Sequence, residues 1–552
     1  MITRRLFCQT APAGLLFFRQ TQAQDRFAMQ NCPNEWSYSS GKTYADPFNE
    51  VELDVVFTPP SGEKIRMSAF WAGDQTWRVR FAAPQTGRYS FETVCSDTAN
   101  TDLHGRRGTL TVEPYSGKNP LYQHGNIRVA QDRRHFEHAD GTPFLWLGDT
   151  WWMGLCKRFS WPDDFQKLTV DRVQKGFNVV QIVAGLYPDM DPYDPRGANE
   201  AGYPWEKGYA KINPAYFDMA DVRIQHLAAH GIVPCVVGFW GYFLPQMGIK
   251  RARQHWRYPV ARWGAYPSVW CLAGEGTMPF YLSKTRTEDE ETQRHGLTDL
   301  ARYVRSIDGL HHIITVHPSK NARACVDDPS LIDFDMMQTG HGDRKSVPNT
   351  ISSVRTSLEA SPKMPALVGE VCYEGIQEAS REEVQRFLFW SCMLSGAAGH
   401  TYGANGIWQV NTEEKPFGLS PHGHSWGGPP WNVAAQLPGS GQTGLAKALL
   451  GRYSWWKLEP QPDIVEPHWN KEDYWQPYAA RIPGEAVIAF TPSGGKALQF
   501  RNLEQAKYRA FLFNPSDGTE QPLGAVTPDA SGAWKGPEFP IFRDWVLVLD
   551  RR

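Results

Sequence analysis

Between residues 140 and 458 the sequence alternates short apolar runs with amphipathic stretches, and this alternation limits the fold more than any other feature. Eight runs are apolar, at 144–148, 177–184, 232–240, 269–274, 312–316, 334–338, 366–369 and 400–403. Helical periodicity lies between most of them, at 165–175, 216–230, 298–306 and 382–395. Buried parallel strands are apolar on both faces, so eight of them with helical crossovers predict a (β/α)8 barrel.

An open doubly wound sheet is the alternative architecture for such an alternation. That fold usually carries a glycine-rich phosphate-binding turn after its first strand. The first apolar run continues instead as Leu-Gly-Asp-Thr-Trp-Trp at 147–152, which is not a turn of that kind. We therefore expect an α/β chain built on a TIM barrel.

The segments on either side of the barrel show strand patterns and turns in place of helical periodicity. Within residues 27–115, apolar and polar residues alternate in short stretches such as 51–57, 77–81 and 89–94. The last segment has strand-like runs at 486–490, 508–513 and 545–549. Short alternating strands separated by turns predict antiparallel β-sandwiches. The expected domains are 24–118, 119–460 and 461–552, after a leader at 1–23.

The first 23 residues resemble an export signal with a twin-arginine start. Arg4 and Arg5 precede an apolar stretch at 11–18, and Thr-Gln-Ala at 21–23 offers a cleavage site after Ala23. The apolar stretch is much shorter than the roughly 20 residues of a membrane-spanning helix. We expect export to the periplasm or the extracellular space, with a retained N-terminus as the alternative.

The charge and aromatic content indicate the kind of partner. A formal net charge of -2 gives no basic field to attract nucleic acid or an anionic membrane, and we expect neither as a partner. Aromatic residues make up 13% of the chain, including 22 Trp and 21 Tyr. Because sugar rings stack their apolar faces on Trp and Tyr, this excess favours a carbohydrate substrate, although core packing explains part of it.

The cysteines and histidines do not form a recognisable metal site. None of the nine cysteines belongs to a Cys-x-x-Cys pair or to a Cys/His cluster with zinc-ligand spacing, so we expect no metal and no other cofactor. His422-Gly423-His424 does not change this expectation, since no carboxylate cluster accompanies it. Cys32 and Cys95 are candidates for a disulfide if the N-terminal segment folds alone.

Two of the predicted barrel strands end in a glutamate. The apolar runs at 268–275 and 365–370 deliver Glu275 and Glu370 to the C-terminal ends of the fourth and seventh strands. Strand alternation places both side chains on a face of small or apolar residues, which favours the barrel interior. A carboxylate pair at this end of a barrel can cleave a glycosidic bond. A separation of roughly 5–5.5 Å indicates retention, and roughly 6.5–9.5 Å indicates inversion.

Other polar and aromatic residues occupy strand ends or the long loops at 187–213 and 405–433, which are expected to shape the pocket. The candidates for substrate binding are Asp149, Trp151, Trp152, Tyr187, Asp189, Trp240, His317, His341, Tyr402 and Trp426. Each has a structural alternative: Asp149 can cap the next segment, the histidines can be satisfied structural residues, and the aromatic residues can pack in the core. Glu374 is the rival of Glu370 as nucleophile.

The sequence Asp-Gly-Thr-Pro-Phe-Leu-Trp-Leu-Gly-Asp-Thr-Trp-Trp at 140–152, followed by Gly-Phe-Asn-Val-Val-Gln at 176–181, resembles the start of the DUF4038 barrels. This group of clan A-like glycoside hydrolases includes the apiosidases, glycoside hydrolase family 140. Residues 27–115 resemble the DUF5060 sandwich that often precedes such barrels. The C-terminal segment resembles the collagen-binding-type sandwich that often follows them.

The resemblance implies roles for the two glutamates. In clan A enzymes the acid/base follows the fourth strand and the nucleophile ends the seventh, which corresponds to Glu275 and Glu370 here. The chain differs from the pattern at two adjacent positions. Many clan A members have Asn where this chain has Gly274, and the apiosidases have Asp where this chain has Glu275.

These observations lead to one hypothesis and one alternative. The hypothesis is an exported glycoside hydrolase that acts by retention on a plant or microbial polysaccharide or oligosaccharide. It would be exo-acting and would remove a side-chain sugar. Glu275 would donate and then abstract a proton, and Glu370 would form the glycosyl-enzyme. The alternative is a non-catalytic carbohydrate-binding protein that uses the barrel as a scaffold. A serine hydrolase is not supported, because the sequence has no Gly-x-Ser-x-Gly motif.

Overall fold

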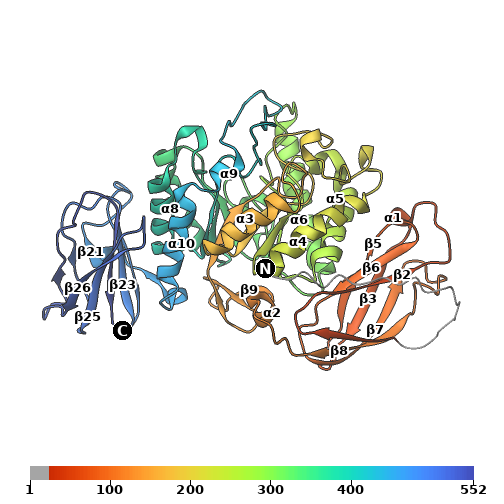
Figure 1. Cartoon of the computed structure of the whole chain (residues 1–552), viewed down its shortest axis with the longest axis horizontal. Helices are drawn as coiled ribbons and strands as arrows, with labels where there is room; N and C mark the ends of the chain where they lie inside the picture. Colours follow the sequence, from red (N-terminus) through yellow and green to blue (C-terminus); the bar gives the residue numbers. More distant parts are fainter. Residues whose placement is uncertain (1–23, 552) are drawn as a thin grey trace, which may run out of the picture.

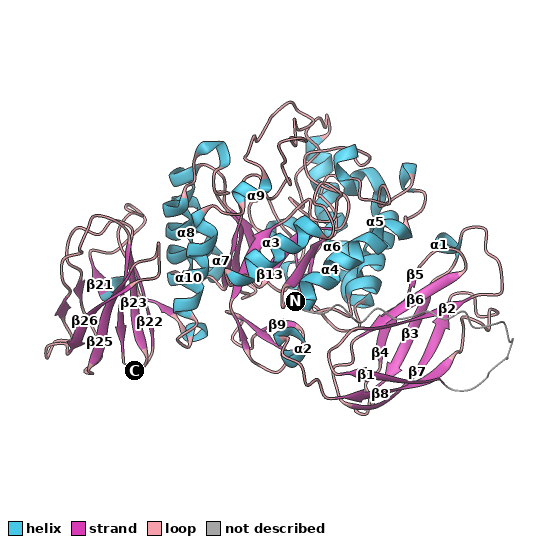
Figure 2. Cartoon of the chain, viewed as in Figure 1, coloured by secondary structure: helices cyan, strands magenta, loops and turns pink. Residues whose placement is uncertain are grey.

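The computed structural model describes residues 24–551. Along its long axis lie an N-terminal β-sandwich, a central barrel and a C-terminal β-sandwich (Figure 1). Figure 2 shows helices around the strands of the barrel, whereas the two outer domains consist mostly of strands. The export signal predicted at 1–23 lies outside the described residues. Within residues 24–551, the helices are all too short or too polar to cross a membrane.

The N-terminal sandwich packs a five-stranded sheet, in the order β1-β8-β7-β3-β4, on a three-stranded sheet, in the order β2-β6-β5. The strands are β1 (Gln24–Met29), β2 (Asn34–Ser39), β3 (Leu53–Thr58), β4 (Ile65–Ser68), β5 (Phe70–Trp71), β6 (Thr76–Phe81), β7 (Gly87–Cys95) and β8 (Arg107–Glu113). Between the sheets, the rings of Phe57 and Phe81 stack with centroids 3.9 Å apart.

The candidate disulfide of this domain is not formed, because Cys32 and Cys95 are free thiols. Cys32 follows β1, whose last residue Met29 pairs with Glu113 at one end of β8. β7 carries Cys95 past the opposite end of β8, beyond Arg107. The two thiols therefore lie at opposite ends of the sheet, whereas a disulfide needs Cα atoms roughly 4.4–6.8 Å apart.

Eight parallel strands form the barrel in the order β16-β15-β14-β13-β12-β19-β18-β17. They are β12 (Trp146–Thr150), β13 (Val179–Val183), β14 (Val233–Val237), β15 (Val269–Cys271), β16 (Ile314–Thr315), β17 (Asp335–Gln338), β18 (Ala366–Glu370) and β19 (Gly399–Tyr402). Between β16 and β17 the Asp333 N–H donates to the carbonyl oxygen of Ile314 at 2.8 Å, which brings the two ends of the sheet together. The predicted (β/α)8 barrel is confirmed.

Helices cover the outside of the barrel in most crossovers. They are α3 (Asp163–Gln174), α4 (Pro214–Ala229), α5 (Phe243–Trp263), α6 (Arg286–Ile307), α7 (Val347–Glu359), α8 (Glu382–Leu394) and α10 (Pro438–Leu450). The crossover from β16 to β17, described throughout, contains only short 3-10 turns at Ala322–Cys325 and Pro329–Leu331. α6 begins well before the expected residue 298, because its charged first turns are mostly exposed and carry no apolar periodicity.

A small sheet covers the N-terminal end of the barrel. It consists of β9 (Ile127–Val129), β10 (Phe136–His138) and β11 (Pro143–Phe144), and α2 (Pro120–His124) precedes it. Phe136 packs against Trp146 and Phe334, with ring centroids 5.5 and 5.1 Å away. This end is therefore filled by side chains, and the C-terminal ends of the strands form the face where sites of such barrels lie.

A buried ion network joins the N-terminal sandwich to the barrel. Arg80 of β6 and Arg262 of α5 contact the same carboxylate, Asp221 of α4, at 2.5 and 2.8 Å. Trp263 donates from Nε1 to the other oxygen of Asp221 at 2.7 Å. All four side chains are buried, where a charge is tolerated only when it is paired. The network therefore fixes the sandwich against the helices of the barrel.

The C-terminal sandwich packs a six-stranded sheet, β20-β22-β23-β28-β25-β26, on a three-stranded sheet, β21-β24-β27. The strands are β20 (Glu459–Pro460), β21 (Val465–Glu466), β22 (Tyr478–Ile482), β23 (Ala486–Thr491), β24 (Gln499–Phe500), β25 (Tyr508–Phe513), β26 (Glu520–Val526), β27 (Trp534–Lys535) and β28 (Trp545–Asp550). The domain is anchored on α8, where Trp390 stacks on Phe490 and Arg386 pairs with Asp544 at 2.5 Å.

Candidate active site

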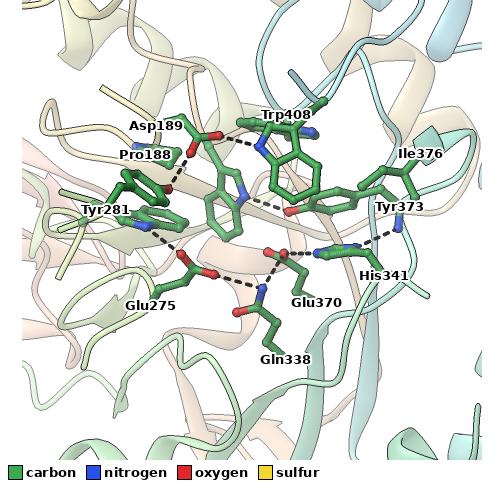
Figure 3. A pocket seen from close by; sticks show the side chains of 13 residues that line it. Pro188, Asp189, Glu275, Tyr281, Gln338, His341, Glu370, Tyr373, Ile376 and Trp408 are labelled. Atoms are coloured by element: carbon green, nitrogen blue, oxygen red, sulfur yellow. Dashed lines mark hydrogen bonds and ion pairs between the residues drawn. The ribbon is translucent and has the colours of Figure 1, made fainter. Parts of the chain in front are cut away.

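The loops at the C-terminal ends of the barrel strands surround a pocket that opens to solvent. Its wall consists of Trp152, Pro188, Asp189, Trp240, Glu275, Tyr281, Gln338, His341, Glu370, Tyr373, Ile376, Trp408 and Trp426. Figure 3 shows carboxylate, amide and aromatic side chains gathered around this space. Four of the lining side chains are tryptophans, and three are carboxylates.

Glu275 stands on a strained turn just after β15. Its φ is 41°, in the left-handed region that residues other than glycine seldom adopt. Trp240 donates from Nε1 to Oε2 of Glu275 at 3.1 Å. Burial raises the pKa of Glu275, and the nearby charge of Glu370 raises it further. Glu275 is therefore suited to carry a proton.

The residue before Glu275 has to be a glycine because of Trp240. A Cβ on Gly274 would lie 2.2 Å from two atoms of the Trp240 ring. An isolated parallel bridge between Trp240 and Gly274 holds the two segments side by side. The indole thus fills the space that a side chain at 274 would need, which accounts for glycine where many clan A members have asparagine.

Glu370, the last residue of β18, is 4% exposed and is held by two histidines. Nε2 of His341 lies 2.8 Å from Oε1 of Glu370, and Nε2 of His317 lies 3.1 Å from Oε2. Burial alone would raise the pKa of Glu370, but the two imidazoles outweigh it and hold the pKa well below its ordinary value. Glu370 is therefore suited to stay ionised.

The backbone determines which nitrogen of each histidine carries a proton. The Tyr373 N–H donates to Nδ1 of His341, and the Glu275 N–H donates to Nδ1 of His317, each at 3.4 Å. A ring nitrogen that accepts a hydrogen bond carries no proton, so Nε2 is the protonated nitrogen in both rings. His341 thus donates from Nε2 to Glu370 even when its ring is neutral, whereas Nε2 of His317 approaches Oε2 of Glu370 without the geometry of a hydrogen bond.

Gln338, at the end of β17, bridges the two glutamates. Its Nε2 donates to Oε1 of Glu275 at 3.2 Å and to Oε1 of Glu370 at 3.0 Å. Because both oxygens bind the same nitrogen, the sum of these distances, 6.2 Å, is the upper limit of their separation.

Asp189 is the third carboxylate of the pocket and lies in the loop after β13. Tyr281 donates from its hydroxyl to Oδ1 at 2.5 Å, and Trp426 donates from Nε1 to Oδ2 at 2.8 Å. Tyr281 follows Glu275 in the loop after β15, and Trp426 belongs to the loop after β19. Asp189 therefore ties three loops together. Figure 3 shows it across the pocket from the two glutamates.

Most of the residues predicted from the sequence meet in this pocket. Those that line it are Trp152, Asp189, Trp240, Glu275, His341, Glu370 and Trp426. His317 is buried behind the wall, where it contacts Glu370, the Glu275 N–H and the ring of Trp152. The lining residues that sequence reasoning missed are Pro188, Tyr281, Gln338, Tyr373, Ile376 and Trp408. The sequence pattern could have identified Gln338, since it ends an apolar run as the glutamates do. The others lie in loops without periodicity.

Besides His317, four predicted residues do not line the pocket, namely Asp149, Trp151, Tyr187 and Tyr402. Asp149 is fully buried and faces the helices, where it pairs with Arg172 of α3 at 2.6 Å. It also accepts a hydrogen bond from Nε1 of Trp151 at 2.8 Å, which holds that indole in the core. Asp149 therefore lies outside the pocket wall, and the partners of its carboxylate are structural.

The two tyrosines are likewise turned to the helix layer. The hydroxyls of Tyr187 and Tyr216 lie 2.6 Å apart, and both side chains are buried. Tyr402 donates to Oε2 of Glu374 at 2.5 Å, and the Gly439 N–H donates to Oε1 of the same carboxylate at 3.0 Å. Burial raises the pKa of Glu374 to about 6. Glu374 is therefore a buried structural carboxylate outside the pocket wall.

His422 and His424 lie beside the pocket in the loop after β19. The ring of His422 stacks on Tyr281 with centroids 4.6 Å apart, and the ring of His424 meets Trp426 edge-on at 4.5 Å. Both rings thus contact aromatic residues of the wall. Across residues 24–551, His, Cys, Asp and Glu side chains do not gather in any group of three that could hold a metal ion.

The barrel and its paired carboxylates at the ends of the fourth and seventh strands define a glycoside hydrolase. A family model described as "Apiosidase-like, catalytic domain" matches residues 130–457, and the chain belongs to this family. A second model, for the domain of unknown function DUF5060, matches residues 32–96 in the N-terminal sandwich. A comparison with curated proteins gave no match.

Solved structures show the same fold. One described as "Glycoside hydrolase" has 22% identity and a TM-score of 0.62, over 79% of this chain and 98% of its own. A glycoside hydrolase family 5 structure from Bacteroides vulgatus ATCC 8482 has 23% identity and a TM-score of 0.65, over 78% and 95% of the two chains. Another structure from that organism has 16% identity and a TM-score of 0.69, over 95% and 100%. At these identities the likeness concerns the fold alone.

Proposed function

We propose that this protein is a retaining glycoside hydrolase that removes a terminal or side-chain sugar from a polysaccharide or oligosaccharide. The observation that carries the proposal is the bridge from one Gln338 nitrogen to both glutamates. Because one nitrogen bonds to both, the bridged oxygens lie at most 6.2 Å apart. This close approach supports the short spacing of retaining pairs, roughly 5–5.5 Å, over the roughly 6.5–9.5 Å of inverting pairs.

In the first step Glu275 is the acid and Glu370 is the nucleophile. The raised pKa of Glu275 keeps a proton available for the leaving-group oxygen, and the lowered pKa of Glu370 keeps its carboxylate ionised. A carboxylate oxygen of Glu370 bonds to the anomeric carbon as the bond from that carbon to the leaving oxygen breaks. The leaving oxygen takes the proton of Glu275, and a glycosyl-enzyme remains.

In the second step the roles reverse. Glu275, now a carboxylate, takes a proton from water while the water oxygen bonds to the anomeric carbon. The bond to Glu370 breaks, and the free sugar leaves. Two displacements at the anomeric carbon restore its configuration.

The loops around the pocket support action at a chain end. Asp189 joins the loops after β13, β15 and β19, as described above. Arg196 adds further links, because its guanidinium donates to the carbonyl oxygens of Phe417 and Leu419 in the loop after β19. A pocket closed by tied loops accommodates one terminal sugar better than the middle of a polymer.

The deciding experiment measures hydrolysis and the anomer that forms first. A panel of 4-nitrophenyl glycosides, apiosides included, and of plant and microbial polysaccharides is followed by NMR. We expect the wild type to release a sugar with the configuration of the substrate. Glu275→Gln and Glu370→Gln should lose at least about 100-fold in kcat/KM, whereas Glu374→Gln, the matched control outside the pocket, should not.

Two outcomes would contradict the proposal. Inverted configuration in the first product would exclude retention, and an active Glu370→Gln variant would exclude its role as nucleophile. Saturable binding of a glycan that the wild type never hydrolyses would favour the non-catalytic carbohydrate-binding alternative.

Export is part of the proposal and rests on the leader-like sequence at 1–23. Mass spectrometry of the protein from fractionated cells should find the mature chain outside the cytoplasm, beginning at Gln24. Replacing Arg4 and Arg5 by Lys should retain it inside. An intact N-terminus in the cytoplasmic fraction of the unaltered protein would contradict export.

A further inference from the structure

We propose that a second carbohydrate-binding site lies in the cleft between the N-terminal sandwich and the N-terminal end of the barrel, and that it binds a neutral stretch of polysaccharide. The inference goes beyond the proposed function, because the cleft and the pocket lie at opposite ends of the barrel strands. Three features carry it: the space in the cleft, the amide side chains that line it, and the balance of its charges.

The cleft is bounded by two parts of the molecule. Its sandwich side consists of the turn after β1, the turn between β3 and β4, and the segment after β6. Its barrel side consists of the end of α2, the turn between β10 and β11, and the loop between α6 and β16. Figure 1 shows α2 below the barrel, next to the sandwich. Water can occupy about 480 Å³ of the cleft, whereas a single water needs roughly 10–15 Å³, so there is room for a large ligand.

Three amide side chains of the cleft have a fixed orientation and an unused oxygen. Gln30, Asn31 and Gln123 each donate from the side-chain nitrogen to a backbone carbonyl oxygen at 3.0 Å. These bonds determine which end of each amide is the nitrogen and which is the oxygen. Among the described residues no donor bonds to the three side-chain oxygens, although an amide oxygen can accept two hydrogen bonds. The cleft therefore offers three acceptors to the hydroxyl groups of a ligand.

Gln85 and Asn126 also line the cleft, and their side chains can both donate and accept. Gln85 is exposed and Asn126 is half-buried. Within residues 24–551 neither side chain makes a hydrogen bond. A sugar hydroxyl also donates and accepts, so an amide can pair with it in both directions. Binding through these two residues would therefore break no hydrogen bond inside the protein.

The charged groups of the cleft are close to balance. Glu63 and Lys64 are neighbours of opposite charge, and Oδ2 of Asp140 lies 2.7 Å from Nδ1 of His124. Phe, Trp and Tyr are absent from the described residues that line the cleft. A strongly charged ligand or an apolar one therefore gains little here, and a neutral ligand rich in hydroxyl groups fits best.

An extended peptide is the alternative occupant, but the sheet edge beside the cleft is already covered. β4 is the edge strand of the five-stranded sheet, and its first residue, Ile65, lines the cleft. Met67 of this strand forms an antiparallel bridge with Asp308. The next residue, Gly309, packs so closely that a Cβ there would lie 2.2 Å from the carbonyl oxygen of Arg66. A peptide therefore cannot add to this edge as a further strand, which favours a glycan.

The test is affinity electrophoresis of the full-length protein in native gels that contain a soluble polymer. The neutral probes are hydroxyethyl cellulose, xyloglucan and galactomannan. Carboxymethyl cellulose and polygalacturonate are the anionic probes, and gelatin represents an extended polypeptide. We expect at least one neutral polysaccharide to retard the protein more strongly than the anionic probes and gelatin do. This readout requires no hydrolysis, so it stands apart from the test of the reaction.

Variants then locate the binding in the cleft. Gln85→Ala and Asn126→Ala remove no hydrogen bond of the folded protein, so the melting temperature should stay close to that of the wild type. Combined, they should raise the Kd for the neutral polysaccharide by about 5- to 100-fold, the value of two lost hydrogen bonds. Gln131→Ala is the matched control, since it removes an exposed amide outside the cleft. The double variant should keep the wild-type kcat/KM on a 4-nitrophenyl glycoside, because a substrate that small reaches only the pocket.

Several results would overturn the inference. Retardation by none of the neutral polysaccharides would exclude the site. Tighter binding of gelatin or of an anionic polysaccharide than of every neutral one would refute the class of ligand. Unchanged retardation of the folded double variant would mean that the cleft is not where the glycan binds. Failure of the catalytic proposal would appear separately, as a protein that is retarded but hydrolyses none of the glycosides.

Discussion

Replacing His341 by alanine is expected to move the acid limb of the pH–activity profile to higher pH. Nε2 of His341 donates to Oε1 of Glu370 at 2.8 Å, and this contact helps to keep the pKa of Glu370 low. A hydrogen bond to a charged group contributes about 1.5–3 kcal/mol, and one pKa unit corresponds to about 1.4 kcal/mol. The pKa of Glu370 should therefore rise by about 1–2 units.

In the proposed mechanism Glu370 is the nucleophile, and this role sets the direction of the shift in the acid limb. The nucleophile must be ionised, so a higher pKa leaves less of it active at low pH and shifts the acid limb upward. The alkaline limb belongs to Glu275, whose raised pKa comes from burial and from the charge of Glu370, and it should stay in place. Activity near neutral pH should change less than activity near pH 4.

The assay is kcat/KM from about pH 3 to pH 9 on the glycoside that the wild type hydrolyses best. His295→Ala serves as the control, because His295 lies on the exposed side of α6 and pairs there with Asp327. Circular dichroism at each pH excludes unfolding as the cause. An acid limb that stays within about 0.3 unit of the wild type, or that moves to lower pH, would refute this account of how Glu370 is held.

Three further predictions concern stability. Gly274→Ala should lower the free energy of unfolding by about 1–3 kcal/mol in urea titrations, because the added Cβ displaces the Trp240 ring, and it should also reduce activity. A variant as stable as the wild type would contradict this packing. Asp149→Asn should cost about 1.5–3 kcal/mol in the same assay, since it removes the charged partner of Arg172 Nε and leaves Asp171 as the remaining carboxylate paired with that guanidinium; a loss below about 1 kcal/mol would mean that the ion pair is not structural. Dithiothreitol should leave the melting temperature unchanged, because the eight described cysteines are free, and a fall on reduction would reveal a disulfide.

The architecture could be predicted because the barrel strands are short, apolar and regularly spaced. Each of the eight apolar runs contains or overlaps a barrel strand. The start of α6 could not be placed from its apolar pattern, since its first turns bury little surface and owe their helical form to charged helix-forming residues. The connection from β16 to β17 also departs from regular alternation, because only 3-10 turns link these strands.

The two glutamates could be predicted because each ends an apolar run, but the direction of other strand-end side chains could not. Asp149 and Tyr402 are register neighbours on β12 and β19, and both face the helices. Barrel strands are apolar on both faces, so their sequences do not reveal which face is the interior. Tyr281 and Trp408 come from loops, and only the folded chain brings them to the pocket.

The bridge made by Gln338 ties the spacing of the two carboxylates to a single side chain. The strands determine where Glu275 and Glu370 leave the backbone, but a single amide spans the space between their ends. A shorter side chain at 338 would remove that constraint without moving any strand. The spacing of the two carboxylate ends therefore depends on one side chain, whereas the shape of the pocket depends on three interlocked loops and would change only through several concerted substitutions.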